Sequence, residues 1–441
     1  MPGRGMEMYQ AGTIGRTGND SGIYEIKAMR RDAETIIQRT IEDVLPMKAV
    51  REVLDEVIIT KPVYVIAIGK AAWGMADEAA RLLGPRIVEG IVVTKYGHSR
   101  GPIEGFHIME TAHPFPDHNS MLAAGKVLEL ADRITDKEEV LLLLSGGGSA
   151  LVEMPAPGLT LQEVTRVTEI LLKCGANIVE INTVRKHLSA IKGGKLAKHI
   201  QPAGGYAIIL SDVVGNHPEM IASGMTYADD TNAPEVMEVI EKYHLDVGDK
   251  VIRVLEKAEE TLVSNITNIV KGNVEELCSA AAEHARELGY KPYVFSTSTG
   301  CEAKELGKWF AETAKMIRKN NPWKIETPCA VIIGGETVVK VIGNGLGGRN
   351  QEIALQTAAG IQGMDKTVLF SLASDGTDGP TDAAGGIVDG YTVKALEEKG
   401  MDIGEYLMDN DAYHALREID GLIMTGPTGT NVNDVTVLLI K

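Results

Sequence analysis

The sequence predicts an α/β protein made of two α/β domains with mainly parallel sheets and a cleft between them. Short runs of apolar and β-branched residues alternate with longer stretches of helical periodicity along the chain of 441 residues. Glycine-rich segments follow several of these apolar runs, as expected where strands of a parallel sheet end and helices begin. The length suffices for two or three domains of ordinary size.

The composition narrows the class of protein. The 44 Lys and Arg against 61 Asp and Glu give a net charge of −17, which disfavours nucleic acids and anionic membranes as partners. No apolar run approaches the roughly 18 residues of a membrane-spanning helix. Residues 1–22 are rich in glycine without a hydrophobic stretch, so we expect a flexible tail rather than a signal peptide. The four cysteines form no CxxC motif, which argues against a zinc site or a disulfide framework. We therefore expect a soluble cytoplasmic protein.

The first half of the chain predicts an N-terminal α/β domain over residues 23–255. Helical periodicity covers residues 24–58 with a break near Pro46. Strands are then predicted at 63–68, 91–94, 106–110, 140–144 and 206–210, and helices at 69–83, 121–131, 161–174 and 181–199. This alternation is typical of a doubly wound sheet, whose ligands bind beyond the carboxyl ends of the strands.

The second half predicts a C-terminal α/β domain over residues 256–441. The chain is expected to be helical from residue 232 to about residue 271, with the domain junction inside this stretch. Strands are predicted at 293–296, 330–333, 338–342, 367–372, 422–424 and 435–440, and helices at 273–288, 302–318, 350–360, 391–399 and 411–417.

The segment LLLLSGGGSAL, residues 141–151, carries the strongest functional signal. The leucines predict a strand that is buried on both faces. Ser145, Gly146, Gly147, Gly148 and Ser149 follow it, and consecutive glycines allow backbone N–H groups to converge on an anion at the start of a helix. We interpret the segment as a phosphate- or carboxylate-binding loop, with a tight strand-to-helix turn as the alternative. A nucleophile elbow is excluded, since Leu151 stands where that motif needs glycine.

Several cations are candidates for binding an anionic ligand. Lys70 follows the strand at 63–68, and Arg349 follows Gly343-x-Gly345-x-x-Gly348. This glycine pattern matches a dinucleotide fingerprint, but an arginine next to it favours an anion loop that presents a guanidinium clamp. Arg185, Ser189 and Lys192 are expected on one stripe of the helix at 181–199, where solvated helix surface is the alternative. His113, in the proline-rich segment TAHPFPDHN, is expected either to bind substrate or to cap a strand end.

Acids past strand ends are candidates for metal binding or proton acceptance. Asp212 follows the strand at 206–210 and either binds Mg²⁺ or caps a turn. The segment SDGTDG contains Asp375, Thr377 and Asp378, and suits Mg²⁺ coordination or a base that accepts a hydroxyl proton. The loop over residues 426–435 is a further candidate for cradling phosphate.

Taken together, the motifs resemble those of glycerate 2-kinases of the MOFRL family, in order, from about residue 24 onward. They are GKAAWGMA, HPFPD, LSGGGSALVEMPAPGLTL, NTVRKHLSAIKGGKLA, SDVVGNHPEMIASG, GGETVVKVIGNGLGGRNQE, SDGTDGPTDAAGG and GPTGTNVND. The resemblance implies a Rossmann-like N-terminal domain and a C-terminal MOFRL domain. It also implies phosphorylation of D-glycerate at its C2 hydroxyl, with ATP and Mg²⁺, to give 2-phosphoglycerate.

The resemblance assigns roles to three residues, and the patterns described above give the other expected site residues. Lys70, Arg349 and Asp375 match the positions proposed as catalytic. The expected substrate- and phosphate-binding residues are Ser145, Gly146, Gly147, Gly148, Ser149, Arg185, Asn350 and Thr377, and the expected metal ligands are Asp212 and Asp378. The sequence leaves open which loop binds ATP and which binds glycerate.

Two other functions compete with the kinase. Relatives have been named hydroxypyruvate reductases, but hydride transfer needs a long dinucleotide groove and one clear fingerprint. A non-catalytic glycerate-binding protein would need the anion loops without an acid cluster, and Asp375 and Asp378 argue against it. We expect small-molecule partners only, D-glycerate and ATP, with the oligomeric state open and a homodimer as one option.

Overall fold

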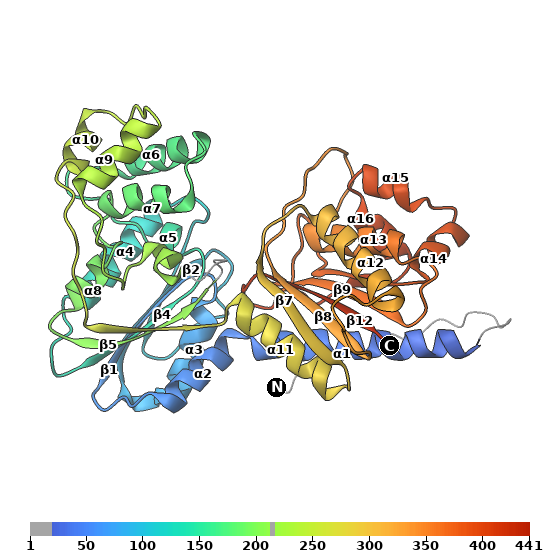
Figure 1. The fold of residues 1–441 in the computed structure, drawn as a ribbon. Helices are drawn as coiled ribbons and strands as arrows, with labels where there is room; N and C mark the ends of the chain where they lie inside the picture. The colour runs from blue at the N-terminus through green and yellow to red at the C-terminus, as the bar shows by residue number, and fades with distance from the viewer. Residues whose placement is uncertain (1–19, 212–216) are drawn as a thin grey trace.

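The computed structural model describes residues 20–211 and 217–441 and contains two α/β domains that lie side by side (Figure 1). The first domain is built on a parallel six-stranded sheet of order β3-β2-β1-β4-β5-β6. The predicted strands are confirmed, and β6 is an additional strand within a stretch predicted to be helical. The strands are β1 (Val63–Ile68), β2 (Ile87–Lys95), β3 (Phe106–Thr111), β4 (Glu139–Leu144), β5 (Gly204–Leu210) and β6 (Ile266–Lys271).

Helices cover both faces of the first sheet. In β4, Leu141 and Leu143 pack into one hydrophobic cluster with α2 (Pro46–Glu56) and α3 (Ala72–Leu83). Leu142 and Leu144 pack on the other face with α4 (His118–Ala131) and α8 (Lys195–Ile200). The prediction of a strand buried on both faces is therefore confirmed. Four further helices form a smaller cluster of their own, at the top of this domain in Figure 1: α6 (Leu161–Lys173), α7 (Ile178–His187), α9 (Ala233–Lys242) and α10 (Asp249–Leu255).

The second sheet is mostly antiparallel, so the prediction of mainly parallel sheets is wrong for this domain. Its order is β11-β10-β9-β12-β8-β7, and only the β7–β8 pair is parallel. The C-terminal strand β12 runs antiparallel between β8 and β9, and β10 returns antiparallel beside β9. The strands are β7 (Lys291–Thr299), β8 (Cys329–Gly335), β9 (Thr367–Ala373), β10 (Gly385–Asp389), β11 (Leu422–Ile423) and β12 (Asp434–Ile440). The strand predicted at 338–342 is absent, and that segment makes only an isolated bridge between Val338 and Glu302.

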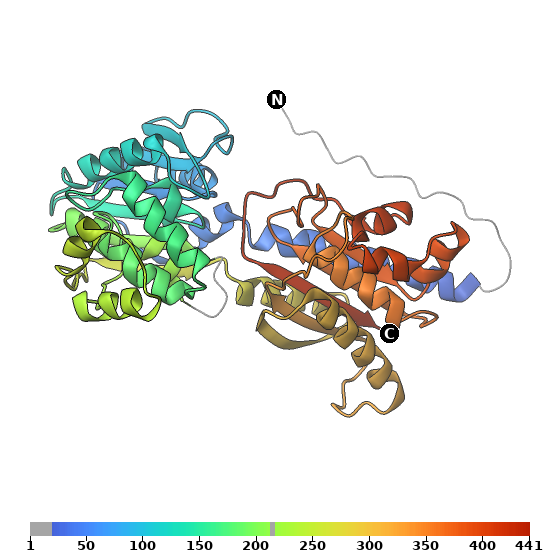
Figure 2. The ribbon, with the colours of Figure 1, turned by 90° about the horizontal axis from the view of Figure 1, so that it is seen from above.

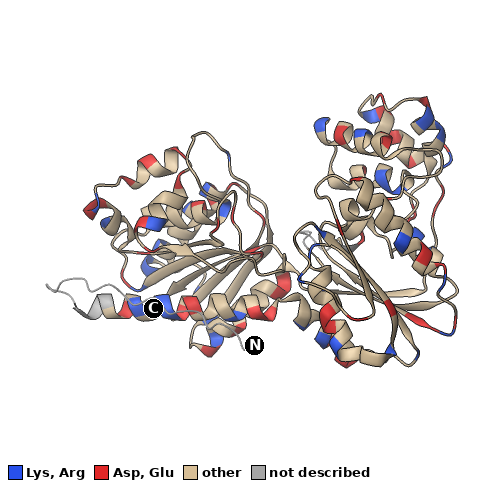
Figure 3. Cartoon of the chain, turned by 180° about the vertical axis from the view of Figure 1, so that it is seen from behind, with Lys and Arg blue, Asp and Glu red and all other residues tan. Residues whose placement is uncertain are grey.

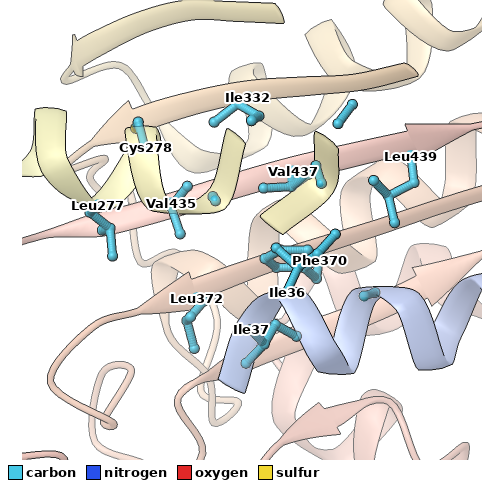
Figure 4. Close-up of a cluster of buried hydrophobic side chains, with 14 of the residues drawn as sticks. Ile36, Ile37, Leu277, Cys278, Ile332, Phe370, Leu372, Val435, Val437 and Leu439 are labelled. Atoms are coloured by element: carbon cyan, nitrogen blue, oxygen red, sulfur yellow. The ribbon is translucent and has the colours of Figure 1, made fainter. Parts of the chain in front are cut away.

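Two helices from distant parts of the chain cover one face of the second sheet. They are α1 (Asp20–Asp43) and α11 (Val274–Glu287). In Figure 4, Ile36 and Ile37 of α1 and Leu277 and Cys278 of α11 lie over Phe370, Leu372, Val435 and Val437 of the central strands. Helix α1 thus packs on the second domain although it precedes the first, and β6 belongs to the first sheet although it lies beyond residue 255.

The opposite face of the second sheet packs on a separate cluster of helices. These are α12 (Ala303–Lys319) and α13 (Arg349–Gly360), with α14 (Thr392–Glu398), α15 (Ile403–Met408) and α16 (Ala412–Glu418) around them (Figure 2). Over residues 20–211 and 217–441, no helix combines the length and the apolar character needed to cross a membrane.

Candidate functional site

The glycine loop over residues 145–149 connects β4 to the single-turn helix α5 (Gly148–Leu151). It is joined to the end of the neighbouring strand β1 by three hydrogen bonds. The Ser145 N–H donates to the Ile68 carbonyl at 3.0 Å. The Lys70 N–H donates to the Gly146 carbonyl at 3.0 Å, and the Ala71 N–H donates to Ser145 Oγ at 3.1 Å. Gly69 is required here, because it has φ +136° and a Cβ would lie 2.1 Å from Ser145 Oγ. The adjacent strands thus bring Lys70 to the glycine loop, as the strand order dictates.

Lys70 and His113 lie over Gly147. A Cβ on Gly147, which has φ +87°, would lie 3.1 Å from His113 Cδ2 and 3.3 Å from Lys70 Cε. Burial and the charges of Lys70 and its neighbours Lys95 and His98 lower the pKa of His113 to about 4, so its imidazole is neutral at neutral pH. The Lys70 ammonium forms no ion pair with any described residue. The loop is therefore locally positive in an acidic protein.

The backbone N–H groups of this loop are available to a ligand. Within the described part of the chain, no acceptor receives the N–H of Gly146, Gly147 or Gly148. Converging N–H groups beside a lysine suit phosphate or carboxylate oxygens. The expected contribution of a following helix dipole is small, since α5 has only one turn and the macrodipole grows from many aligned peptide units.

Ser149 ties the glycine loop to helix α7. Its Oγ lies 2.8 Å from Ser223 Oγ, and Ser223 Oγ donates to Asn182 Oδ1 at 3.2 Å. Asn182 and Arg185 both belong to α7. Among the described residues, Arg185 forms no ion pair and its buried Nε has no acceptor. Burial lowers the pKa of this guanidinium against the opposing effect of Glu153, so an anion bound nearby would be favoured.

The predicted stripe of Arg185, Ser189 and Lys192 on one helix is wrong. Helix α7 ends at His187, and the chain beyond it pairs with the segment 154–156: the Ala156 N–H donates to the Leu188 carbonyl at 2.8 Å, and the Ala190 N–H donates to the Met154 carbonyl at 2.7 Å. Lys192 is completely buried and ion-paired with Glu153, and its pKa is lowered to about 8 by burial against the attraction of that carboxylate. Lys192 therefore does not belong to an open face with Arg185.

In the second domain, Arg349 begins α13 and binds two acids. Its Nη2 donates to Asp434 Oδ1 at 3.0 Å, and its Nη1 donates to Glu336 Oε1 at 2.9 Å. Burial acts to lower the pKa of Arg349, but Asp434 and Glu336 more than offset it, so the guanidinium stays charged. Burial raises the pKa of Asp434 to about 6 although Arg349 opposes the shift. Asp434 is not among the predicted site residues, and its signal in the sequence is an acid directly before a buried strand.

The SDGTDG segment follows β9, and its two acids have different surroundings. Asp375 Oδ1 accepts hydrogen bonds from the N–H of Thr377 at 2.9 Å and from its hydroxyl at 3.2 Å, while Oδ2 has no donor among the described residues. Buried Asp378 accepts from the N–H of Asn350 at 3.1 Å and from the N–H of Gln351 at 2.9 Å, so it caps the start of α13. Asn350 is buried as well, and its Oδ1 accepts from Ser371 Oγ at 2.6 Å.

The glycine pattern at residues 343–348 is not open to a dinucleotide. The N–H groups of Ile342 and Gly343 donate to Asn410 Oδ1, and those of Asn344 and Leu346 donate to the carboxylates of Asp409 and Asp411. These four hydrogen bonds measure 2.8, 3.1, 2.8 and 2.9 Å. The acceptors are two carboxylates and one amide oxygen of the same chain, so the N–H groups of residues 342, 343, 344 and 346 are used inside the protein and are not available to a pyrophosphate.

The loop before β12, residues 426–433, lies between the SDGTDG segment and Arg100 of the first domain. Because β12 is antiparallel, Asp434 pairs with Gly335 at the end of β8 and with Ala373 at the end of β9. The loop therefore lies beside the SDGTDG segment, where the Thr428 N–H donates to the Asp375 carbonyl at 3.2 Å. On its other side, Thr430 Oγ1 donates to the Val44 carbonyl at 2.9 Å, and a Cβ on Gly429 would lie 3.4 Å from Arg100 Nη2 of the first domain.

The predicted metal ligands remain predictions. Asp212 lies outside the described residues. Asp378 uses its two carboxylate oxygens in capping α13. No group of three or more His, Cys, Asp or Glu side chains with metal-binding geometry occurs in the part of the chain that the structure describes.

Comparison with known proteins gives two matching families and close relatives. Residues 32–256 match a domain of unknown function, DUF4147, and residues 329–434 match the MOFRL family. A D-glycerate 2-kinase of Thermotoga maritima is 46% identical over 95% of this chain and 100% of its own. A glycerate 2-kinase of Pyrococcus horikoshii is 41% identical over 86% and 87%. A protein of Agrobacterium vitis named as a hydroxypyruvate reductase is 36% identical over 85% and 86%. The crystal structure of glycerate kinase from Thermotoga maritima superposes with a TM-score of 0.91 at 45% identity, covering 94% of this chain and 100% of that one.

Proposed function

Because this chain belongs to the glycerate kinase family that combines a DUF4147 domain with a MOFRL domain, we propose that it phosphorylates D-glycerate. It transfers the γ-phosphoryl group of ATP to the C2 hydroxyl and releases 2-phosphoglycerate and ADP. Phosphoryl transfer requires little covalent chemistry from a protein, since positioning and neutralisation of the phosphoryl oxygens supply most of the rate.

The observation that carries the proposal is the glycine loop at 145–149. The N–H groups of Gly146, Gly147 and Gly148 lack acceptors among the described residues, and Lys70, whose ammonium forms no ion pair with them, has its Cε over Gly147. In this proposal the loop binds phosphate oxygens and Lys70 neutralises the charge that develops during transfer. Arg185, a second cation without an ion pair in the described chain, binds a further anionic group of the substrates.

Arg349 acts from the second domain. Buried Asp434 orients its guanidinium through the Nη2 contact. Glu336 is about half exposed, with a relative side-chain accessibility of 47%, so its pairing with Nη1 contributes little to stability. A phosphate or carboxylate oxygen of a substrate can therefore replace Glu336 at Arg349 Nη1, because the displaced Glu336 carboxylate is accessible to water and Arg349 keeps an anionic partner.

Asp375 orients the C2 hydroxyl of glycerate. Thr377 holds Oδ1, which leaves Oδ2 open as an acceptor for the hydroxyl proton. The transition state for phosphoryl transfer is loose, so orientation of the hydroxyl matters more than early removal of its proton. Asn350 supports the site indirectly, because it links Asp378 to Ser371 beneath the start of α13.

Magnesium enters in this proposal with the phosphates of ATP. Mg²⁺ is usually bound by one or two carboxylates and by substrate phosphates rather than by a full protein cage. The Asp378 oxygens cap a helix and Asp375 Oδ2 is assigned to the hydroxyl, so Asp212 remains the predicted carboxylate ligand of the ion. When bound, the ion would neutralise charge on the phosphate oxygens.

The experiment combines purified protein, Mg·ATP and D-glycerate, and identifies the product by ³¹P NMR. We expect ATP-dependent formation of 2-phosphoglycerate in the wild type and a large loss in Lys70→Ala. Formation of 3-phosphoglycerate, or no turnover, would contradict the proposal. A parallel incubation with hydroxypyruvate and NADH or NADPH tests the reductase alternative, for which the occupied N–H groups at 342–346 predict no enzyme-dependent oxidation.

A further inference from the structure

A cavity lies on the first domain, away from the glycine loop. It has a volume of about 700 Å³ and opens where α8, α10, the segment 156–158 and the segment 257–261 meet. Helix α7 separates it from the glycine loop: His187, its last residue, lines the cavity, and Asn182 of the same helix contacts Ser223 beside the loop. None of the residues assigned to phosphoryl transfer above lines this cavity.

The cavity is lined by cations in a protein whose net charge is −17. Lys and Arg occur on helices of both domains, mixed with Asp and Glu (Figure 3). Here the cations gather around one opening, against only two acids, Glu259 and Glu260. The lining cations are Lys195, Lys198, Lys250, Arg253 and Lys257, and His199 lies among them.

Most of these cations lack a carboxylate partner. Lys250 pairs with Glu163 at 3.1 Å, and His199 contacts Asp132 at 2.7 Å. Lys198, Arg253 and Lys257 form no ion pair with any residue that the structure describes. Unpaired like charges that line one cavity repel each other, and a bound anion would remove that repulsion.

Lys195 is the deepest of the cations. Its ammonium donates to the Lys186 carbonyl and to no carboxylate among the described residues. Burial lowers its pKa to about 8, and the nearby Asp229 and Glu153 only partly oppose the shift. A half-buried ammonium without a carboxylate is destabilising unless a ligand completes its surroundings.

We propose that this cavity binds a small organic molecule carrying several phosphate groups, at a site separate from the one that transfers phosphate. The volume lies within the range of small-molecule sites and exceeds what one orthophosphate needs. Arg253 offers a fork of donors that matches phosphate oxygens, while Lys195, Lys198 and Lys257 add point charges.

The test uses isothermal titration calorimetry of the full chain with inorganic tripolyphosphate in buffer without Mg²⁺. The test variant is Lys198→Glu/Arg253→Glu, which changes two exposed cavity residues that make no ion pair with the described chain. The matched control is Arg166→Glu/Lys173→Glu, which makes the same charge change on exposed residues of α6. We expect saturable binding to wild type, a loss of at least about tenfold in the cavity variant and a much smaller loss in the control. Circular dichroism and kinase turnover check that the cavity variant is folded.

Other outcomes would overturn the inference. Equal losses in the cavity and control variants would show that only overall charge matters. A tenfold loss in Lys70→Ala, with the cavity variant unaffected, would place the tripolyphosphate at the glycine loop. Titration with citrate distinguishes the ligand class, and equal affinity for citrate would contradict a phosphate-selective site. A raised KM for ATP in the cavity variant would make the cavity part of the substrate site instead of a separate one.

Discussion

Replacing Gly147 by alanine is the sharpest test of the glycine loop. Gly147 has φ +87°, a conformation that costs an alanine about 1–2 kcal/mol. The added Cβ would also lie 3.1 Å from the His113 ring and 3.3 Å from Lys70 Cε, so both side chains would have to move by a few tenths of an ångström. Because Lys70 is proposed to neutralise the transferring phosphoryl group, we expect kcat/KM to fall by about 10- to 100-fold, as small misplacements of catalytic groups do.

Gly175 provides the matched control. It has φ +79° and no heavy atom within 4 Å of its Cβ position, so Gly175→Ala carries the same backbone strain without touching the site. Urea denaturation should show that both variants lose about 1–2 kcal/mol of unfolding free energy. A coupled assay of ADP formation then measures kcat/KM for each. If Gly147→Ala retains as much activity as Gly175→Ala, Lys70 and the loop do not position the reacting groups.

Five further substitutions test other parts of the site. Lys70→Ala should lower turnover on the order of 10³-fold without altering the unfolding free energy, as measured by the coupled assay and urea denaturation. Asp434→Asn should lower the unfolding free energy by about 2–3 kcal/mol, because the partly buried Arg349 loses its main partner, whereas Glu336→Gln should cost less than about 1 kcal/mol. Asp375→Asn should lower kcat by about 10²–10⁴-fold with unchanged Mg²⁺ dependence, and rescue by added Mg²⁺ would indicate a metal ligand instead. In the folded protein the pKa of His113 is lowered from 6.5 to about 4, so the unfolded chain binds a proton on this histidine at a higher pH than the folded chain does. The free energy of unfolding is therefore unaffected by His113 above pH 6.5 and decreases as the pH falls toward 4. Since His113 is only half-buried, His113→Asn should remove about 1–2 kcal/mol of that pH dependence in urea titrations.

Local sequence patterns predicted most elements of the first domain, because its parallel sheet follows the order of the strand–helix units. The leucines of β4 and the glycines after it required no knowledge of distant residues. The continuous helix predicted over 181–199 is absent because residues 188–190 pair with the segment 154–156, a contact that the local spacing of Arg185 and Lys192 does not indicate. Gly193 and Gly194, which adopt positive φ, indicated only the break directly before α8.

Long-range pairing in the second domain was not predictable in the same way. Residues 343–348 match a nucleotide fingerprint, but Asp409, Asn410 and Asp411 bind their N–H groups from a distant loop. The missing information is tertiary, since nothing near residue 343 indicates which acids will approach it. Similarly, Arg349 was expected as an open clamp, and the structure pairs it with Asp434 from the last strand.

The antiparallel insertion of β12 is what assembles the second half of the proposed site. A parallel strand at that position would begin at the opposite edge of the sheet and carry its preceding loop away from the SDGTDG segment. Running antiparallel, β12 starts beside the ends of β8 and β9, so Asp434 meets Arg349 and Thr428 meets Asp375. The same loop reaches Arg100 of the first domain, and it also binds Val44 at the end of α1. The antiparallel direction of β12, which the sequence did not predict, therefore places the loop before this strand beside both Asp375 and Arg349. The same loop also lies next to the domain that carries Lys70 and the glycine loop.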